Sequence, residues 1–273
     1  MQRFGGRLGG TPPVVLNLLI INILLFLATM LFRNQGLNLE RWLALYYPAS
    51  DLFMPHQLVT HMFMHANFMH IFFNMFALWM FGRVLESVWG SRRFLIYYFV
   101  TGLGAAGLHL LVNFFQMGNL ASDASAAINT LSPEVFADFM KEHFPNQLQQ
   151  ISGFVAGWVE SPGNPGYINE ATNFINQLVN QKMNIPTVGA SGAVFGVLLA
   201  FGMLFPNTRL MLIFPPIPIK AKWFVIIYGV IELYLAVANK PLDNVAHFAH
   251  LGGMIFGFIL IKYWNKNNRK RFY

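Results

Sequence analysis

Residues 186–205 have the sequence PTVGASGAVFGVLLAFGMLF, an apolar window without a charged side chain. A helix needs about 20 mostly apolar residues to cross the roughly 30 Å hydrocarbon core of a bilayer. The window is therefore long enough to span a membrane. Its glycines also matter, because small residues let neighbouring transmembrane helices approach closely. We predict a membrane-spanning helix that packs tightly among others.

Five further windows of similar character flank this one. They are Val14 to Phe32, Phe68 to Gly82, Phe94 to Phe115, Ala221 to Ala238 and Val245 to Trp264. The first is too long for the apolar core of a usual signal peptide and no A-x-A site follows it, so it predicts a retained anchor. The fold class expected is all-α: a polytopic membrane protein with a bundle of six transmembrane helices over residues 14–264.

The composition supports lipid as the solvent. Of the 273 residues, 55% are hydrophobic and 11% are charged, whereas roughly a quarter of the residues in a soluble domain are charged. The absence of cysteine excludes disulfides, thiolate catalysis and Cys-based metal sites. The net charge of +7 does not indicate nucleic-acid binding, because the basic residues lie on short stretches beside the predicted spans.

The basic residues also predict an orientation, since Lys and Arg near span ends tend to stay in the cytoplasm. With both termini inside, the inner segments hold 13 of the 18 Lys and Arg residues. We therefore expect a cytoplasmic N-terminal tail at 1–13 and a basic cytoplasmic tail at 265–273. The membrane predicted from this pattern is the bacterial inner (plasma) membrane.

A long polar segment, residues 116–185, separates the third window from the fourth and is called the insertion below. Ser132-Pro133-Glu134 predicts a helix start within it. The Gly- and Pro-rich run at 161–166 divides it. We expect two short helical pieces on the extracytoplasmic side, without a separate globular domain.

Ser191 is the first candidate for chemistry, since it lies between Gly189 and Gly192 in the fourth window. Flanking glycines leave room for a substrate backbone to approach its hydroxyl. The same residues have a simpler explanation, because Gly192 and Gly196 form a small-xxx-small pattern for helix packing. The serine motif alone therefore favours packing over catalysis.

His250 on the sixth window changes this balance. Gly253 and Gly257 follow it on the same helical face, and this face could press against the glycines of the fourth window. Close helix contact is needed for a serine oxygen to reach an imidazole nitrogen at about 3 Å. His247 is an alternative base, but the two glycines are in register with His250.

The second window could supply the remaining role of an acyl-transfer site. His70 and Asn74 are four residues apart, so they share one helical face. The tetrahedral intermediate of acyl transfer carries an oxyanion, and Asn side chains or His N–H groups can donate hydrogen bonds to it. In the expected topology, the second and sixth windows enter the membrane from the same side as the fourth window, which carries Ser191.

These residues together resemble the rhomboid intramembrane proteases. The resemblance extends from about His61 to Tyr263 and consists of three ordered motifs: H-x-x-x-N at His70 and Asn74, G-x-S-G at 189–192, and H-x-x-G-x-x-x-G at 250–257. It implies a six-helix rhomboid fold and a serine endopeptidase that cleaves membrane proteins in or beside their transmembrane helices. The implied partners are such substrates and the lipid bilayer, with no cofactor.

The resemblance implies a role for each motif residue. Ser191 would be the nucleophile, His250 the general base and acid, and His70 with Asn74 the oxyanion donors. The implied catalytic unit is a Ser-His dyad without an acidic member. The glycines that would pack the helices at the site are Gly189, Gly192, Gly196, Gly253 and Gly257.

Two other classes of protein stay open. A non-proteolytic rhomboid-like membrane chaperone or binding protein would share the fold. A metal or haem membrane protein could use His61, His65, His70, His247 and His250 as imidazole ligands, although we expect no metal. Glu232 in the fifth window is an intramembrane carboxylate, a default functional candidate. Its sequence context does not separate a structural role from a role in gating.

Overall fold

The computed structural model describes residues 10–211, 216–238 and 246–267. The elements are, in chain order, α1 (Pro13–Asn34), α2 (Glu40–Leu43), α3 (Gln57–Thr60), η1 (His61–Phe63), α4 (Phe68–Ala77), η2 (Leu78–Gly82), α5 (Arg83–Trp89), α6 (Ser91–Asn129), α7 (Pro133–His143), η3 (Pro145–Gln147), α8 (Leu148–Glu160), α9 (Pro165–Met183), α10 (Ser191–Leu204), β1 (Arg209–Met211), β2 (Pro218–Lys220), α11 (Ala221–Ala238) and α12 (His247–Asn267). Most of the two predicted tails, and Val245, lie outside the described residues.

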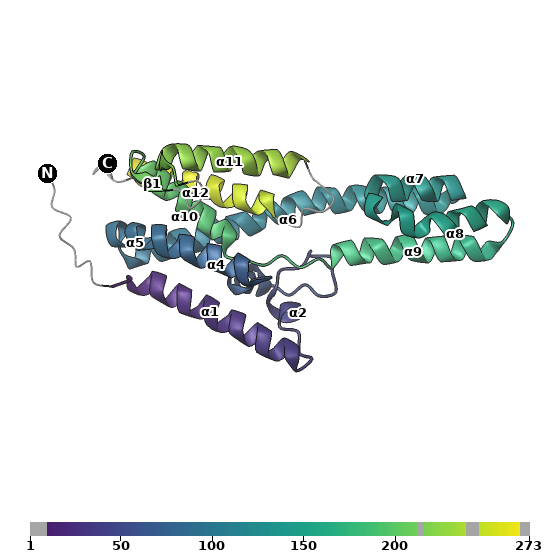
Figure 1. The fold of residues 1–273 in the computed structure, drawn as a ribbon, viewed down its shortest axis with the longest axis horizontal. Helices are drawn as coiled ribbons and strands as arrows, with labels where there is room; N and C mark the ends of the chain where they lie inside the picture. The colour runs from purple at the N-terminus through teal and green to yellow at the C-terminus, as the bar shows by residue number, and fades with distance from the viewer. Residues whose placement is uncertain (1–9, 212–215, 239–245, 268–273) are drawn as a thin grey trace.

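Six helical segments pack side by side as a bundle: α1, the continuous rod α4–η2–α5, α6, α10, α11 and α12 (Figure 1). The short α10 is its centre and contacts α4, α6, α11 and α12. Most of its residues are buried. Strands β1 and β2 form a small antiparallel hairpin before α11. The membrane-protein class is therefore supported by a helical bundle with a glycine-rich helix in its middle.

Four of the bundle segments are long and apolar enough to cross a membrane: Pro13–Asn34, Phe68–Trp89, Ser91–Asn129 and Ala221–Ala238. Helix α10 has only 14 residues, which at about 1.5 Å per residue extend roughly 21 Å. It is thus shorter than the hydrocarbon core. The count of six crossings stays a prediction for α10 and α12.

Glycines let the central helices meet backbone to backbone. A Cβ on Gly253 of α12 would collide with the carbonyl oxygen of Gly192 on α10. A Cβ on Gly252 would lie 2.9 Å from Cα of Ala105 on α6. Such contacts leave no room for a methyl group, as expected where helices associate by close packing.

Three predicted windows do not match the ends of their helices. The second window was expected to end at Gly82, but its helical rod continues to Trp89. Helix α10 begins at Ser191 rather than Pro186, because Gly189 has a φ of 126°, a left-handed value that ends regular helix geometry. Helix α6 runs on to Asn129, well past the predicted end at Phe115. Hydropathy falls after Phe115, but residues such as Leu120 and Ala124 are good helix formers and pack against the helices of the insertion.

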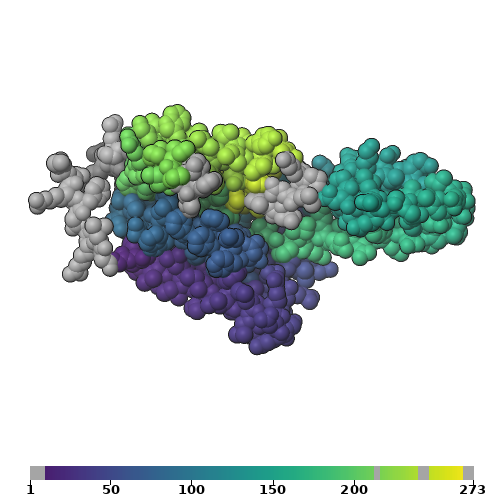
Figure 2. Space-filling model, in the orientation of Figure 1, coloured from purple at the N-terminus to yellow at the C-terminus, as the bar shows by residue number. Residues whose placement is uncertain are grey.

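The insertion also differs from the prediction of two short helical pieces. It contains the outer part of α6 together with α7, η3, α8 and α9, and these form a second hydrophobic core around Phe136 and Trp158. Figures 1 and 2 show it as a lobe at one end of the bundle, opposite the end where α1 begins and α12 ends. The predicted helix start is present, with the Ser132 hydroxyl accepting from the Val135 N–H.

Candidate active site

Ser191 is the first residue of α10, at the end of an extended segment that is held in place by backbone hydrogen bonds. Thr187 and Leu45 form a two-residue bridge, with N···O distances of 2.8 and 2.9 Å. The Gly189 N–H donates to the His61 carbonyl at 2.9 Å. The segment just after α2, at Leu45, and η1, at His61, thus fix the position of the serine. The N-terminal end of α10 also carries a partial positive charge.

His250 meets this serine from α12. Its Nε2 lies 2.9 Å from Ser191 Oγ, within hydrogen-bond distance. The Phe195 ring, one turn after the serine, stacks on the imidazole with a centroid distance of 4.2 Å and an interplanar angle of 8°. The contact of Gly253 with Gly192 brings the two helices close enough for this hydrogen bond.

A carboxylate lies on the other side of the imidazole. Oε2 of Glu232, on α11, is 2.9 Å from Nδ1 of His250 and 2.6 Å from Nδ1 of His247. All three side chains are buried. His250 therefore bridges Ser191 and Glu232, while His247 faces the carboxylate with its Nδ1. The geometry favours His250 over His247 as the base.

His70 and Asn74 approach the same region from α4. A Cβ on Gly189 would lie 2.7 Å from Nε2 of His70 and 3.5 Å from Ser191 Oγ, so the imidazole lies directly beside the segment that carries the serine. The Nδ2 group of Asn74 is buried and has no hydrogen-bond partner among the described residues. An unpaired buried donor costs free energy, and a ligand oxygen could pair with it.

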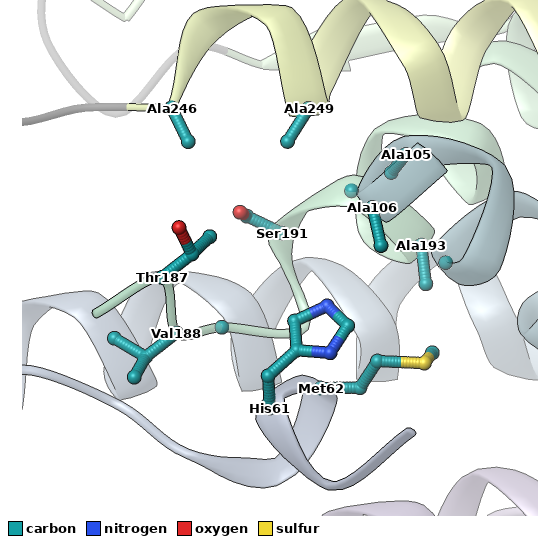
Figure 3. A pocket seen from close by; sticks show the side chains of 13 residues that line it. His61, Met62, Ala105, Ala106, Thr187, Val188, Ser191, Ala193, Ala246 and Ala249 are labelled. Atoms are coloured by element: carbon teal, nitrogen blue, oxygen red, sulfur yellow. The ribbon is translucent and has the colours of Figure 1, made fainter. Parts of the chain in front are cut away.

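A pocket opens beside Ser191 (Figure 3). Its lining includes His61, Thr187 and Ser191 and otherwise consists mostly of small side chains, among them Ala246, just before α12, and Ala249 of α12. Figure 3 shows the Ser191 hydroxyl between these alanines and Thr187. The roles implied for His70, Asn74 and His250 place these residues around Ser191, but none of the three lines this pocket.

The glycines expected to pack the helices at the site have distinct neighbours. Gly253 brings α12 against the backbone of Gly192 on α10. The other three face α6: a Cβ on Gly192 would meet Ala105, one on Gly196 would meet Thr101, and one on Gly257 would meet Tyr97. Gly189 is not a helix-packing residue. Its positive φ and its contact with the His70 ring require glycine at the turn before α10.

The five histidines considered as metal ligands do not form one group. Among the described residues, only Glu232, His247 and His250, and separately Asp123, Glu142 and His143, bring three ligand atoms together. Two ligand atoms on a tetrahedral zinc are about 3.3 Å apart, given bond lengths near 2.0–2.1 Å. The 2.6 and 2.9 Å separations at Glu232 are hydrogen-bond distances instead.

Glu232 is the functional candidate that the sequence left without a role. Its helix is apolar on most sides, so its pattern does not indicate which residue faces the bundle. A spacing signal was present, since His247 and His250 lie on one face of the next helix. Only the three-dimensional packing of α11 against α12 joins the carboxylate to them.

The chain matches a family model, described as a rhomboid domain, over residues 53–160 and 167–266. An uncharacterized mitochondrial rhomboid protein of Schizosaccharomyces pombe is 27% identical over 217 residues, 77% of this chain and 52% of that protein. Mitochondrial rhomboid protein 1 of Saccharomyces cerevisiae is 34% identical over 86 residues, 32% of this chain and 24% of that protein. Chloroplastic rhomboid-like protein 11 of Arabidopsis thaliana is 34% identical over 88 residues, 32% of this chain and 29% of that protein. The chain thus spans about half or less of the length of these curated relatives.

The relatives contradict the predicted location. All three are named as mitochondrial or chloroplastic proteins, so the similarity is to proteins of eukaryotic organelles and the prediction of a bacterial inner membrane is wrong. The physical reason is that a bias of Lys and Arg reports on which side of a membrane a loop stays. It does not identify the membrane.

Proposed function

The chain belongs to the rhomboid family, and on that premise we propose that it is an intramembrane serine endopeptidase that hydrolyses peptide bonds in or beside the transmembrane helices of other membrane proteins. The observation that carries the proposal is the 2.9 Å contact between Ser191 Oγ and His250 Nε2. A nucleophile within hydrogen-bond reach of a base is the arrangement that acyl transfer through serine requires.

The proposed reaction begins with attack of Ser191 Oγ on the scissile carbonyl carbon. As the C–O bond forms, the serine proton moves to Nε2 of His250. The resulting imidazolium then gives this proton to the leaving amine when the C–N bond breaks. Water attacks the acyl-enzyme in a second cycle of the same steps, with His250 again as base and then acid, and releases the new carboxyl end.

The proposed oxyanion donors are the Asn74 amide, the His70 imidazole and the Ser191 N–H at the start of α10. The unpaired Nδ2 of Asn74 supports this role, because a donor without a partner can bind the oxyanion without first breaking another hydrogen bond. The dipole of α10 adds partial positive charge at the same place. These groups would stabilise the negative charge as it develops.

The pocket supports a substrate with small side chains near the cleaved bond. Its alanine- and glycine-rich lining leaves a narrow space beside the serine. Hydrolysis also requires an extended backbone, because a helix hides its carbonyls in hydrogen bonds. We therefore expect substrates whose helices unwind easily, with small or helix-breaking residues near the cleavage point.

The test is cleavage of a labelled single-span membrane protein by the purified chain in liposomes, together with labelling by a fluorophosphonate probe. Ser191→Ala and His250→Ala should each lower cleavage by at least about 1,000-fold and abolish labelling of residue 191. Ser125→Ala, at an exposed serine of α6, is the control and should behave like the intact chain. An intact protein that neither cleaves several substrates nor takes up the probe would contradict the proposal and favour a non-proteolytic role.

A further inference from the structure

We propose that Glu232 is a positioning residue for this reaction: its carboxylate keeps a proton on Nδ1 of His250, so that Nε2 presents its lone pair to Ser191. The role rests on the peptidase function proposed above and extends the expected dyad to a Ser-His-Glu triad. The Glu is supplied by α11, a helix that contributes neither the nucleophile nor the base.

The geometry of α11 singles out this side chain. The buried residues of the helix are Ala221, Val225, Glu232 and Ala236, so the carboxylate is the one charged group on its inward face. Large apolar neighbours on α11 face outward, with Val230 60% and Val237 73% exposed. Burying a carboxylate on such a face costs free energy unless it is fully hydrogen-bonded. Glu232 therefore depends on its hydrogen-bond partners.

The partners determine the protonation of the imidazoles. An ionised carboxylate can only accept hydrogen bonds, so a ring nitrogen 2.6–2.9 Å from Oε2 carries the hydrogen. A neutral imidazole has one N–H and one lone pair. With its proton on Nδ1, His250 has the lone pair on Nε2, the atom that lies 2.9 Å from Ser191 Oγ.

The same contact stabilises the charge that the reaction creates. When Nε2 takes the serine proton, His250 becomes an imidazolium, and its Nδ1–H remains bonded to the negative Glu232. The carboxylate does not take the proton in this scheme; it fixes the tautomer and offsets the positive charge. His247 donates a second hydrogen bond to Oε2, which helps to hold the carboxylate in one orientation.

Glu86 offers a matched control, because it is a second buried carboxylate with a different kind of partner. Its oxygens accept from the Val14 and Val15 N–H groups at the start of α1, at 3.0 and 2.8 Å, and from the Ser91 hydroxyl at 2.7 Å. These contacts join helices and do not involve the site. Glu86→Gln therefore reports the effect of neutralising a buried carboxylate without touching His250.

The kinetic test compares Glu232→Gln with Glu86→Gln in liposomes. Glu232→Gln should lower kcat about 10- to 100-fold with little change in KM, since the amide can donate to Nδ1 and favour the wrong tautomer. The rate of fluorophosphonate labelling at Ser191 should fall in parallel. Glu86→Gln should retain the kcat of the intact chain in its folded fraction. Intact kcat and labelling rate in Glu232→Gln would overturn the positioning role while leaving the peptidase function in place.

A spectroscopic test keeps the inference independent of activity and of the folding of any Glu232 variant. Nitrogen-15 NMR of the histidine-labelled intact protein in lipid reports which nitrogen of His250 carries the hydrogen, with the signal assigned by its loss in His250→Ala. We expect the proton on Nδ1. A proton on Nε2 instead would overturn the role of Glu232, whether or not the protein cleaves a substrate. Absence of cleavage and labelling with the proton on Nδ1 would refute the peptidase function alone.

Discussion

The bundle and the insertion reach buried cores by different means. In the bundle, helices meet through glycines, and Gly253 lies directly against the backbone of Gly192. In the insertion, helices meet through large rings, and Trp158 stacks on Tyr167 with a centroid distance of 6.0 Å and an interplanar angle of 6°. The outer surfaces differ as well. Within the insertion, the exposed large hydrophobic residues are Val159, Ile168 and Ile185, whereas α1 alone has more than twice as many.

The solvents predicted for the two regions, lipid around the bundle and water around the insertion, would account for this difference. In water, burying large apolar side chains drives helices together. In lipid, the surroundings are as apolar as the side chains, so association depends on close contact and on polar bonds between helices. We therefore expect an added methyl group to disrupt the packing of the bundle, and the loss of a ring to destabilise the insertion.

Among changes to helix packing, the largest effect is expected for Gly253→Ala. The new Cβ would collide with the Gly192 carbonyl oxygen, a backbone atom that cannot rotate away, so α12 must move from α10. A displacement of about 1 Å at a catalytic pair can cost roughly 100-fold in rate. We expect at least that loss in initial cleavage rate.

Gly107→Ala is the matched control for this change, because Gly107 of α6 has open space at its Cβ position. It should retain the rate of the intact chain. Equal rates for Gly253→Ala and Gly107→Ala would show that the close contact between α10 and α12 does not set the distance from Ser191 to His250.

Asn74→Ala should act on the reaction without weakening the bundle. Removing a donor to the oxyanion lowers kcat by about 100- to 1,000-fold in comparable sites. Because Nδ2 is buried without a partner among the described residues, its loss leaves no new unpaired group and should not lower the melting temperature in detergent. A fall in melting temperature with an unchanged kcat would reverse the assignment and make Asn74 a structural residue.

The residues just discussed show which parts of the site were visible in the sequence. Ser191 and His250 could be proposed from the sequence because each lies in a local motif with small residues, and such motifs mark helices that pack closely. Glu232 could not be assigned a role in this way, because the sequence of a helix that is apolar on most sides does not show which face points into the bundle. The start of α10 was missed because a positive φ at Gly189 is a backbone property. The end of α6 was missed because hydropathy reports the solvent around a helix, and the helix continues when that solvent changes.

Trp158→Ala tests the insertion with a lost ring. The side chain is 1% exposed and contacts Phe136, Phe154 and Tyr167, so truncation should cost about 3–5 kcal/mol of local stability. Hydrogen exchange of α7–α9 in the full chain measures this loss. Cleavage should stay within about threefold of the intact rate, since the ring belongs to the second core and not to the core around α10.

The exposed neighbour Val159 provides the control for this change. Val159→Ala should alter hydrogen exchange little, because surface substitutions usually change stability by less than about 0.5 kcal/mol. A loss of cleavage in Trp158→Ala as large as that of Gly253→Ala would show that the two cores are one energetic unit.

Gly153→Ala is expected to have the smallest effect, with the opposite sign to Gly253→Ala. Gly153 lies inside α8, is exposed, and has no atom within 4 Å of an added Cβ. Alanine is favoured over glycine in an exposed helix interior by about 0.8–1.0 kcal/mol, so amides of α8 should exchange roughly 4- to 5-fold more slowly when they open locally. Cleavage should not change. The same substitution thus stabilises a helix where its methyl group meets solvent and disrupts the site where it meets a backbone. Faster exchange in α8 would mean that open space at the glycine does not decide the sign, and the contrast between the two cores would need another cause.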